Sequence, residues 1–379
     1  MTMNKNNLNP DLAHSISQLR FPLAVLVVFC HANILSFPIK GLFSEFGVIQ
    51  YPILLLSKII FEPAVPLFFL ISGILFFWNV KIYDKSAYRS KIKKRMKSLL
   101  LPYLVWNIIY DIPQLSKWLF DCIRNGGGYD GLITILESLV NLWFWTNQVD
   151  RLPNFEMTTP IDPPLWFVRD LFVCMLCSMV IYRVLNKKST CIIFLSILLF
   201  WWLTGKYQYL FPGISVPSFL FFGIGSAIGI HKIDIMKILK KYEKIILGIF
   251  LVLFLGMVFS GYYIQGVERP LLQENKYLIS PYILFSIPTY ILIACEVKKF
   301  RSLNIEGLAA ASFTLFACHW LVLDALKRIF GHFIKGCIGE GEMMLIQLAL
   351  YVVPCLTGIF IYLVIKQSDK AKLLLNGGR

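Results

Sequence analysis

The stretch FPLAVLVVFCHANILSF (residues 21–37) decides the fold class, because its length and composition are those of a helix that crosses a lipid bilayer. A hydrocarbon core about 30 Å thick requires roughly 20 mostly apolar residues at a rise of about 1.5 Å per helical residue. The stretch has no small-x-small cleavage site, and many further apolar runs follow it. We therefore interpret it as a retained first span and not as a secretory signal.

Apolar runs of this kind recur along the whole chain. The 379 residues are 57% apolar, 15% aromatic and only 16% charged, and the mean hydropathy is +0.66. A soluble domain carries about 25% charged residues, so these values predict an all-α integral membrane protein, a bundle of about ten transmembrane helices. The predicted spans are about 19–37, 52–79, 98–112, 164–185, 190–205, 214–231, 245–264, 278–296, 308–326 and 343–365.

Basic residues outnumber acidic ones and give the chain a net charge of +15. They sit in short connections between the apolar runs and form no continuous stripe, so no nucleic-acid partner is predicted. When both termini are placed in the cytoplasm, most of the 37 Lys and Arg residues fall on the inner side, in agreement with the positive-inside rule. The charge pattern therefore predicts that both termini are cytoplasmic.

Residues 113–163 then form the only long outer connection that the sequence predicts. Their moderately apolar stretch, residues 132–145, predicts an interfacial or re-entrant helix, with an eleventh span as the alternative. No polar stretch is long enough to build a soluble domain, so residues 1–379 are expected to form a single membrane domain. The nine cysteines are scattered and mostly lie within apolar runs, which predicts neither a disulfide framework nor a metal site.

Arg20 and His31 are the first candidate functional residues. Eleven positions separate them, which on an α-helix is only about 20° away from three full turns, so they share a helix face. Their separation along the axis is about 16 Å, which places Arg20 at the cytoplasmic surface and His31 near the middle of the bilayer. A polar residue at that depth usually faces a cavity or a partner, so His31 is predicted to be functional, with helix packing as the alternative.

A basic cluster, KIKKRMK (residues 91–97), precedes the third span. Positive-inside anchoring explains it as well as a functional role does. In the functional interpretation, Arg95 joins Arg20 in binding the phosphate groups of a nucleotide-like donor through forked hydrogen bonds. In the second span, Glu62 either pairs with Lys58 or lines a polar cavity.

Four further residues are candidates for supporting or acceptor-side roles. Trp166, Arg169 and Asp170 open the fourth span on its outer side, where anchoring at the membrane interface is the alternative explanation. His319 is the second histidine predicted to lie well inside a span. It either supports the chemistry or has a structural role.

Together these segments resemble the membrane-bound acyltransferase family 3, whose members modify surface polysaccharides and lipids. The matching segments, in the family's order, are R20-x10-H31, VPLFFLISG (65–73), R95-x6-PY (95–103), LWF (165–167) and SFTLFACH (312–319). They are spread over nearly the whole chain. The family often has a second arginine three residues after the one that matches Arg95, and here that position is Ser98.

The resemblance implies a ten-helix core that takes an acyl group, usually acetyl, from coenzyme A inside the cell and delivers it to an acceptor at the outer face. The implied partners are acyl-CoA, a carbohydrate or glycolipid acceptor and the lipid bilayer, in the inner (plasma) membrane of a bacterium. Acetyl-CoA would be a substrate, and no permanently bound cofactor is expected. His31 would be catalytic, as a general base on the acceptor hydroxyl or as an acyl-histidine nucleophile, while Arg20 and Arg95 would bind the donor.

A secondary transporter or flippase of a surface-polymer pathway is the alternative function, with Arg20, His31 and Glu62 along the path of a substrate or proton. Such a protein would turn over without consuming an acyl donor. A non-catalytic assembly subunit is a third interpretation, and the presence of both Arg20 and His31 argues against it. The sequence leaves open the acceptor, the acyl chain and the oligomeric state.

Overall fold

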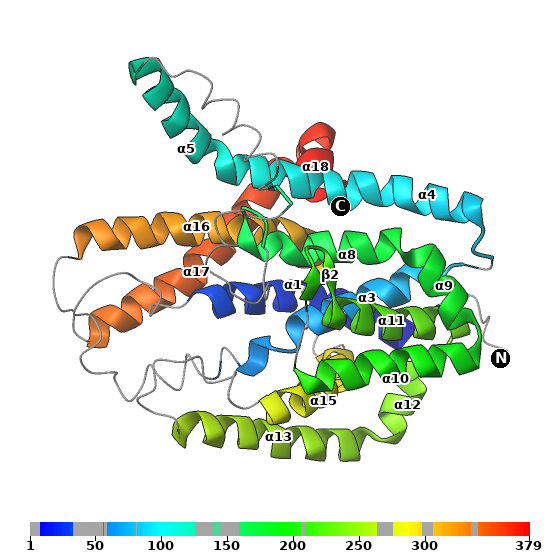
Figure 1. The fold of residues 1–379 in the computed structure, drawn as a ribbon. Coiled ribbons are helices and arrows are strands. Elements are labelled where there is room, and N and C mark those ends of the chain that lie inside the picture. The colour runs from blue at the N-terminus through cyan, green and yellow to red at the C-terminus, as the bar shows by residue number, and fades with distance from the viewer. Residues whose placement is uncertain are drawn as a thin grey trace.

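A computed structural model describes residues 8–32, 56, 59–80, 82–125, 140, 142–143, 159–205, 209–263, 276–297, 306–334 and 340–379. These residues are almost entirely helical, which confirms the predicted all-α class (Figure 1). The longer helices are α1 (Pro10–His31), α3 (Ala64–Phe77), α5 (Leu101–Asn125), α10 (Lys188–Thr204), α11 (Val216–His231), α13 (Glu243–Tyr263), α15 (Lys276–Glu296), α16 (Ser312–Phe333) and α17 (Glu340–Ile365).

Shorter elements join these helices. The short α-helices are α4 (Lys85–Arg95), α8 (Trp166–Leu176), α9 (Ser178–Asn186), α12 (Ile235–Lys241) and α18 (Asp369–Asn376). A π-helical turn (Met96–Leu100) connects α4 to α5, and 3-10 turns (Pro163–Leu165 and Glu306–Ala311) precede α8 and α16. The sequence did not predict a small antiparallel hairpin, β1 (Tyr209–Phe211) with β2 (Ile214–Ser215), which precedes α11.

Among the described residues, five helices are long and apolar enough to cross a membrane. The number rises to seven if each of two bent helix pairs is one span. The first pair is α8 with α9, bent by 61°, and it includes the 3-10 turn Pro163–Leu165 before α8. The second pair is α11 with α12, bent by 107°. The structure thus has several helices able to span a membrane, and the number ten stays a prediction.

Three predicted spans differ in detail from the structure. The span 19–37 was expected to place His31 near its middle, but α1 runs from Pro10 to His31, so His31 lies at the end of the helix. The span 98–112 was expected to end where the outer connection begins, but α5 continues to Asn125. The helix as a whole is amphipathic, and the apolar run of the sequence ends before the helix does. The span 164–185 is interrupted at Cys177, between α8 and α9. The predicted interfacial helix at 132–145 lies almost wholly outside the described residues.

Helix α1 lies inside the bundle, in contact with α3, α15, α16 and α17 (Figure 1). Next to α1, helix α3 packs closely on α11. A Cβ atom at Gly73 would overlap the carbonyl oxygen of Phe222, and one at Gly225 would overlap the carbonyl group of Leu70. Small residues at such crossings let two helix backbones approach closely, so Gly73 and Gly225 have a packing role.

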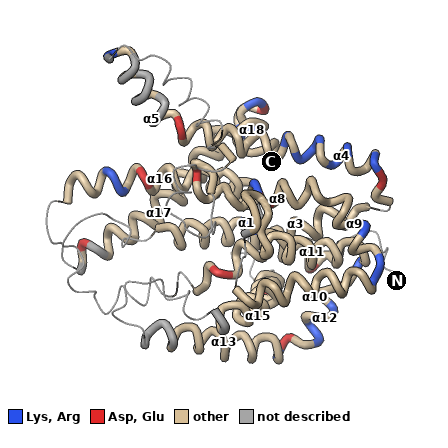
Figure 2. The backbone as a smooth tube through the Cα atoms, in the orientation of Figure 1, with Lys and Arg blue, Asp and Glu red and all other residues tan. Residues whose placement is uncertain are grey.

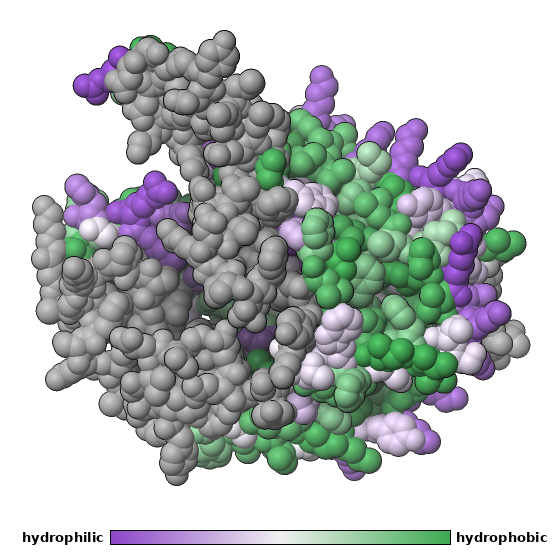
Figure 3. All heavy atoms as spheres, viewed as in Figure 1, coloured by the Kyte–Doolittle hydropathy of each residue, from purple (hydrophilic) through white to green (hydrophobic). Residues whose placement is uncertain are grey.

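The outer faces of the bundle are apolar. Ile192 and Phe200 on α10 are 66% and 72% exposed, Val252 on α13 is 70% exposed, and Phe360 on α17 is 65% exposed. Figure 3 shows this apolar surface over the middle of the molecule, with hydrophilic residues toward its ends. Such a surface is unfavourable in water and suits contact with lipid chains.

Basic residues gather at one end of the bundle. Helix α4, the turn between α9 and α10, and α12 carry their Lys and Arg residues at this end (Figure 2). The start of α1 is attached here, because Lys240 of α12 forms an ion pair with Asp11 at 2.5 Å. We refer to this end as the basic end.

Candidate functional site

Helix α1 positions both Arg20 and His31. It is continuous from Pro10 to His31 even though Pro22 lies within it, so the predicted sharing of one helix is confirmed. His31 is the last residue of the helix, and Ala32 caps it. Arg20 therefore lies toward the basic end and His31 lies about 16 Å further along the axis.

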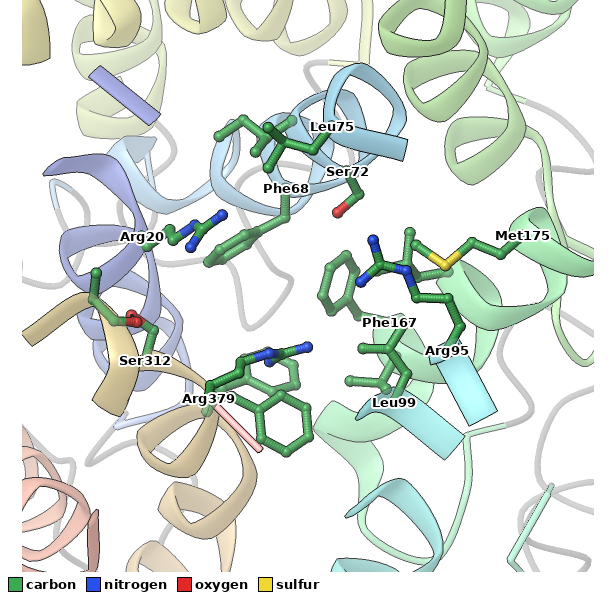
Figure 4. A pocket seen from close by; sticks show the side chains of 16 residues that line it. Arg20, Phe68, Ser72, Leu75, Arg95, Leu99, Phe167, Met175, Ser312 and Arg379 are labelled. Carbon is green, nitrogen blue, oxygen red and sulfur yellow. Dashed lines mark hydrogen bonds between the residues drawn. The ribbon is translucent and has the colours of Figure 1, made fainter. Parts of the chain in front are cut away.

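A cavity of about 180 Å³ contains three guanidinium groups from distant parts of the sequence (Figure 4). Arg20 comes from α1, Arg95 ends α4, and Arg379 follows α18; Figure 4 shows all three pointing into a common space. We call this space the arginine cavity. Its other lining residues are mostly apolar and include Phe68, Ile71, Ser72, Leu75, Leu99, Phe167, Val168, Leu171, Met175, Ala309, Ser312, Phe313 and Phe316.

The electrostatics of the arginine cavity favour an anionic ligand. Among the described residues, no Asp or Glu lines it. Burial, followed by the positive charge of Arg20, lowers the pKa of Arg95 below its ordinary value. Arg20 and Arg379 are both exposed to solvent, so the cavity is accessible. Three cations at an accessible and mostly apolar site have the charge and geometry that suit a multiply charged anion such as a polyphosphate.

His31 lies against a second histidine, His319 of α16. Their ring centroids are 5.3 Å apart, and His319 Nε2 is 3.3 Å from His31 Nδ1. His319 is fully buried and His31 is half-buried. The structure thus brings together two histidines that are 288 positions apart, and we call them the histidine pair.

Backbone carbonyls assign the tautomers of the histidine pair. His31 Nδ1 is 3.0 Å from the carbonyl oxygen of Val27, and His319 Nδ1 is 2.6 Å from that of Phe316. A carbonyl oxygen only accepts hydrogen bonds, so each Nδ1 carries the proton. His319 Nε2 is then a lone-pair acceptor for the N–H of His31 Nδ1. His31 Nε2 remains as the basic nitrogen that can take a proton from another molecule.

Aromatic and polar side chains surround the side of His31 that faces away from the arginine cavity. The Trp320 ring meets His31 edge to face at 5.2 Å, and Lys327 Nζ lies 5.3 Å from the Trp320 ring centroid. One turn after Trp320, Asp324 accepts a hydrogen bond of 2.5 Å from the Tyr110 hydroxyl of α5. This layer offers both an aromatic face and hydrogen-bonding groups next to the histidine pair.

Phenylalanine side chains separate the arginine cavity from the histidine pair. The Phe167 ring packs on Phe68 and on Phe316, each at 5.6 Å between centroids. Phe316 also contacts the ring of His319 at 5.9 Å. All three phenylalanines line the cavity and His31 does not, so we call them the phenylalanine layer.

The remaining predicted residues have different surroundings. Glu62 is half-buried in the turn before α3, directly after Phe61, whose ring contacts His31 at 6.2 Å between centroids. Its suggested partner Lys58 lies outside the described residues. Trp166 begins α8 and packs against the hydrophobic core.

Arg169 and Asp170 form a buried ion pair. Arg169 Nη2 donates to Asp170 Oδ1 at 2.9 Å, and their side chains are 3% and 0% exposed. Arg169 Nη1 also donates to the carbonyl oxygen of Trp143 at 2.7 Å. These contacts hold α8 against Trp143, so the pair has a structural role. Neither residue lines the arginine cavity.

Sequence reasoning missed Arg379 and Trp320 as members of the site. Arg379 lies in a basic tail that has no apolar run or motif, so no signal in the sequence marked it. Trp320 directly follows His319, and its position beside an intramembrane histidine was an available signal. Among the described residues, no group of three His, Cys, Asp or Glu side chains could hold a metal ion.

Comparison with known proteins places this site in a family. Succinoglycan biosynthesis protein ExoH of Rhizobium meliloti (strain 1021) is 24% identical over 274 residues, which are 70% of this chain and 66% of that protein. The chain thus matches just under two thirds of that relative's length. No solved structure matches the chain. Residues 13–364 match the acyltransferase domain that defines the acyltransferase 3 family, and this chain belongs to that family of membrane acyltransferases.

Proposed function

We propose that this protein is an integral membrane O-acetyltransferase of the bacterial inner membrane. In this proposal it takes an acetyl group from acetyl-CoA on the cytoplasmic side and transfers it to a hydroxyl of a surface polysaccharide, a lipid-linked sugar or a glycolipid. Family membership supports acyl transfer, and the name of ExoH, a succinoglycan biosynthesis protein, supports a carbohydrate acceptor. The single observation that carries the proposal is the histidine pair at the far end of the helix that supplies Arg20 to the arginine cavity.

The donor would bind from the basic end. Clustered Lys and Arg residues there support a cytoplasmic position for this end under the positive-inside rule, and the arginine cavity would then open toward the inside of the cell. Arginine forks suit the phosphate groups of coenzyme A, and the apolar cavity wall suits its long pantetheine arm. The thioester at the end of this arm would pass the phenylalanine layer to reach His31.

The transfer step follows from the tautomer of His31. Nε2 takes the proton from the acceptor hydroxyl, whose oxygen then forms a bond to the thioester carbonyl carbon. The C–S bond breaks, and the leaving thiolate takes the proton back from Nε2. While His31 carries both protons, its Nδ1–H is held by the carbonyl oxygen of Val27 and faces the lone pair of His319 Nε2, two interactions that stabilise the imidazolium.

The acceptor would approach from the side of Trp320 and Asp324. An aromatic face beside a carboxylate and a tyrosine hydroxyl provides both stacking and hydrogen bonding for a sugar. With the acceptor on this side and the thioester arriving through the phenylalanine layer, both reactants meet at His31. In this proposal, the two substrates enter from opposite faces of the membrane.

The test is acetyl transfer by the purified protein in lipid nanodiscs, with labelled acetyl-CoA and a panel of surface glycans. Wild type should label at least one glycan, and His31→Ala should lose the label while it still binds acetyl-CoA. His332→Ala is the matched control, because His332 is an exposed histidine near the end of α16. Near-normal transfer by His31→Ala would refute the mechanism. A folded wild type that transfers nothing but moves a solute would favour the transporter.

A further inference from the structure

The last residues of the chain are fastened to the rim of the arginine cavity. Trp106 Nε1 of α5 donates to the carbonyl oxygen of Leu375 at 2.8 Å. The buried side chain of Asn376 donates through Nδ2 to the carbonyl oxygen of Ala310 at 3.0 Å, and to that of Arg379 at 3.2 Å. Helix α18 therefore ends at a defined place, between α5 and the turn that precedes α16.

A two-glycine turn then directs the chain back toward the cavity. Gly377 and Gly378 have φ values of 66° and 78°, in the left-handed region that other residues rarely adopt. A Cβ atom at Gly377 would overlap the backbone carbonyl of Ser98, so the turn fits against Ser98 only because this residue is glycine. The turn places Arg379 beside Arg20 and Arg95.

The Arg379 side chain is positioned, and no Asp or Glu side chain within the described part of the chain forms an ion pair with it. Its guanidinium carbon lies 4.8 Å from the centroid of the Phe313 ring, and Nη2 donates to the carbonyl oxygen of Ser98 at 3.3 Å. Desolvation by the cavity walls, followed by the charges of Arg95 and Arg20, lowers the pKa of Arg379 to about 10, although the residue keeps contact with solvent at the mouth. The chain thus brings a third cation to a site that already holds two.

We propose that Arg379 is a third anion-binding residue of the arginine cavity, delivered by the docked two-glycine turn to grip a diphosphate group. The mutual repulsion of three guanidiniums is relieved when a ligand with several negative charges enters between them. The identification of this ligand as the diphosphate of acyl-CoA rests on the proposed function. The diphosphate site itself rests only on the cavity and the tail.

The experiment measures binding by calorimetry, with the full chain in nanodiscs of zwitterionic lipid. Inorganic pyrophosphate and coenzyme A are the two probes. Arg379→Gln should weaken the binding of both by about tenfold, because hydrogen bonds to charged groups are lost. Arg379→Lys should give an intermediate loss, since a lysine keeps the charge without the fork. Lys370→Gln removes the same charge from an exposed position on α18 and should change neither affinity.

A second variant tests the role of the turn. Gly377→Val keeps Arg379 but should displace it, so it should weaken binding as much as Arg379→Gln does, and the double variant should be no worse than either. Equal affinities for Arg379→Gln and Lys370→Gln would overturn the proposal. If pyrophosphate binding depends on Arg379 but no acyl transfer is found, the site stands and the proposed function fails. If transfer occurs and binding ignores Arg379, only this inference fails.

Discussion

The arginine cavity and the histidine pair both include a residue of helix α1, yet they differ in solvent exposure and in charge. The cavity is open to solvent and holds three positive charges, with no acidic side chain among the described residues that line it. The histidine pair is more enclosed, and each of its rings is held by a backbone carbonyl through Nδ1. The phenylalanine layer lies between them.

This difference assigns separate tasks to the two regions. Fixed cations at an open site contribute affinity for a charged ligand, because they attract it equally before and during the reaction. An oriented imidazole contributes to the chemical step, because its interaction with the reacting proton changes along the reaction. We therefore expect changes in the two regions to affect different kinetic parameters, as the predictions below specify.

The largest expected effect belongs to the histidine pair. His31→Gln keeps a polar side chain of similar reach but removes the basic nitrogen, so kcat should fall by about 10²- to 10⁴-fold. The dissociation constant for acetyl-CoA should stay within about twofold of the wild type, since the arginine cavity is untouched. Rapid-quench kinetics and calorimetry on the same preparation measure the two quantities. A change in affinity as large as the change in kcat would contradict the separation of tasks.

The next largest effect belongs to Arg95. Arg95→Gln should weaken acetyl-CoA binding by about 10- to 100-fold, since it removes charged hydrogen bonds to phosphate. At saturating donor, kcat should remain close to that of the wild type. Lys93→Gln, at an exposed position on the same helix, is the matched control and should have little effect. A loss confined to kcat would show that Arg95 is not a donor ligand.

The sequence predicted the histidine pair and the arginine cavity to different extents. Helical periodicity alone predicts that Arg20 and His31 share one face of one helix, and the structure confirms that one continuous helix carries both. Periodicity says nothing about contacts between helices, so the partnership of His31 with His319 required the packing of α1 on α16. The presence of Arg379 in the arginine cavity could not be predicted from the sequence, because its position depends on a glycine turn and on contacts of the tail with Trp106 and Ala310.

Hydropathy predicted where helices lie better than where they end. An apolar run marks the part of a helix that lipid covers, so the continuation of the amphipathic helix α5 to Asn125 was missed. The break at Cys177 was missed for the opposite reason, since the apolar run continues across it. Position 98 matters both for the family resemblance and for the contacts of Arg379. The family resemblance leads one to expect arginine there, the chain has Ser98, and the guanidinium of Arg379 bonds to the Ser98 carbonyl.

A smaller effect is expected in the layer between the two regions. Phe316→Trp should enlarge the barrier that the donor arm passes, so kcat should fall by about tenfold through poorer placement of the thioester. Binding of coenzyme A should change little, because the guanidiniums that hold its phosphates are unaltered. Phe316→Leu, which keeps an apolar but smaller side chain, should preserve or raise kcat. Equal losses for the larger and the smaller side chain would show that Phe316 has a packing role only.

The smallest effect concerns pH and the rim of the arginine cavity. Lys91 lies one turn before Arg95, and its Nζ donates to the carbonyl oxygen of Phe76 at 2.5 Å. Burial, followed by the charges of Arg95, Lys94 and Lys232, lowers the pKa of Lys91 to about 8. Lys91 is therefore charged below pH 8 and loses its charge above it, so an anion should bind more weakly as the pH rises.

Between pH 7 and pH 9, acetyl-CoA affinity should fall by about two- to threefold, as expected for the loss of one screened charge near the ligand. The phosphates of the donor are already mostly ionised at pH 7, and their remaining ionisation would strengthen binding as the pH rises, so they cannot cause the decline. Lys91→Arg should flatten the profile, because an arginine stays charged throughout. Calorimetry in the His31→Ala background avoids turnover during the measurement. The same decline in wild type and Lys91→Arg would assign the titration to another group and would exclude Lys91 as a contributor to donor affinity.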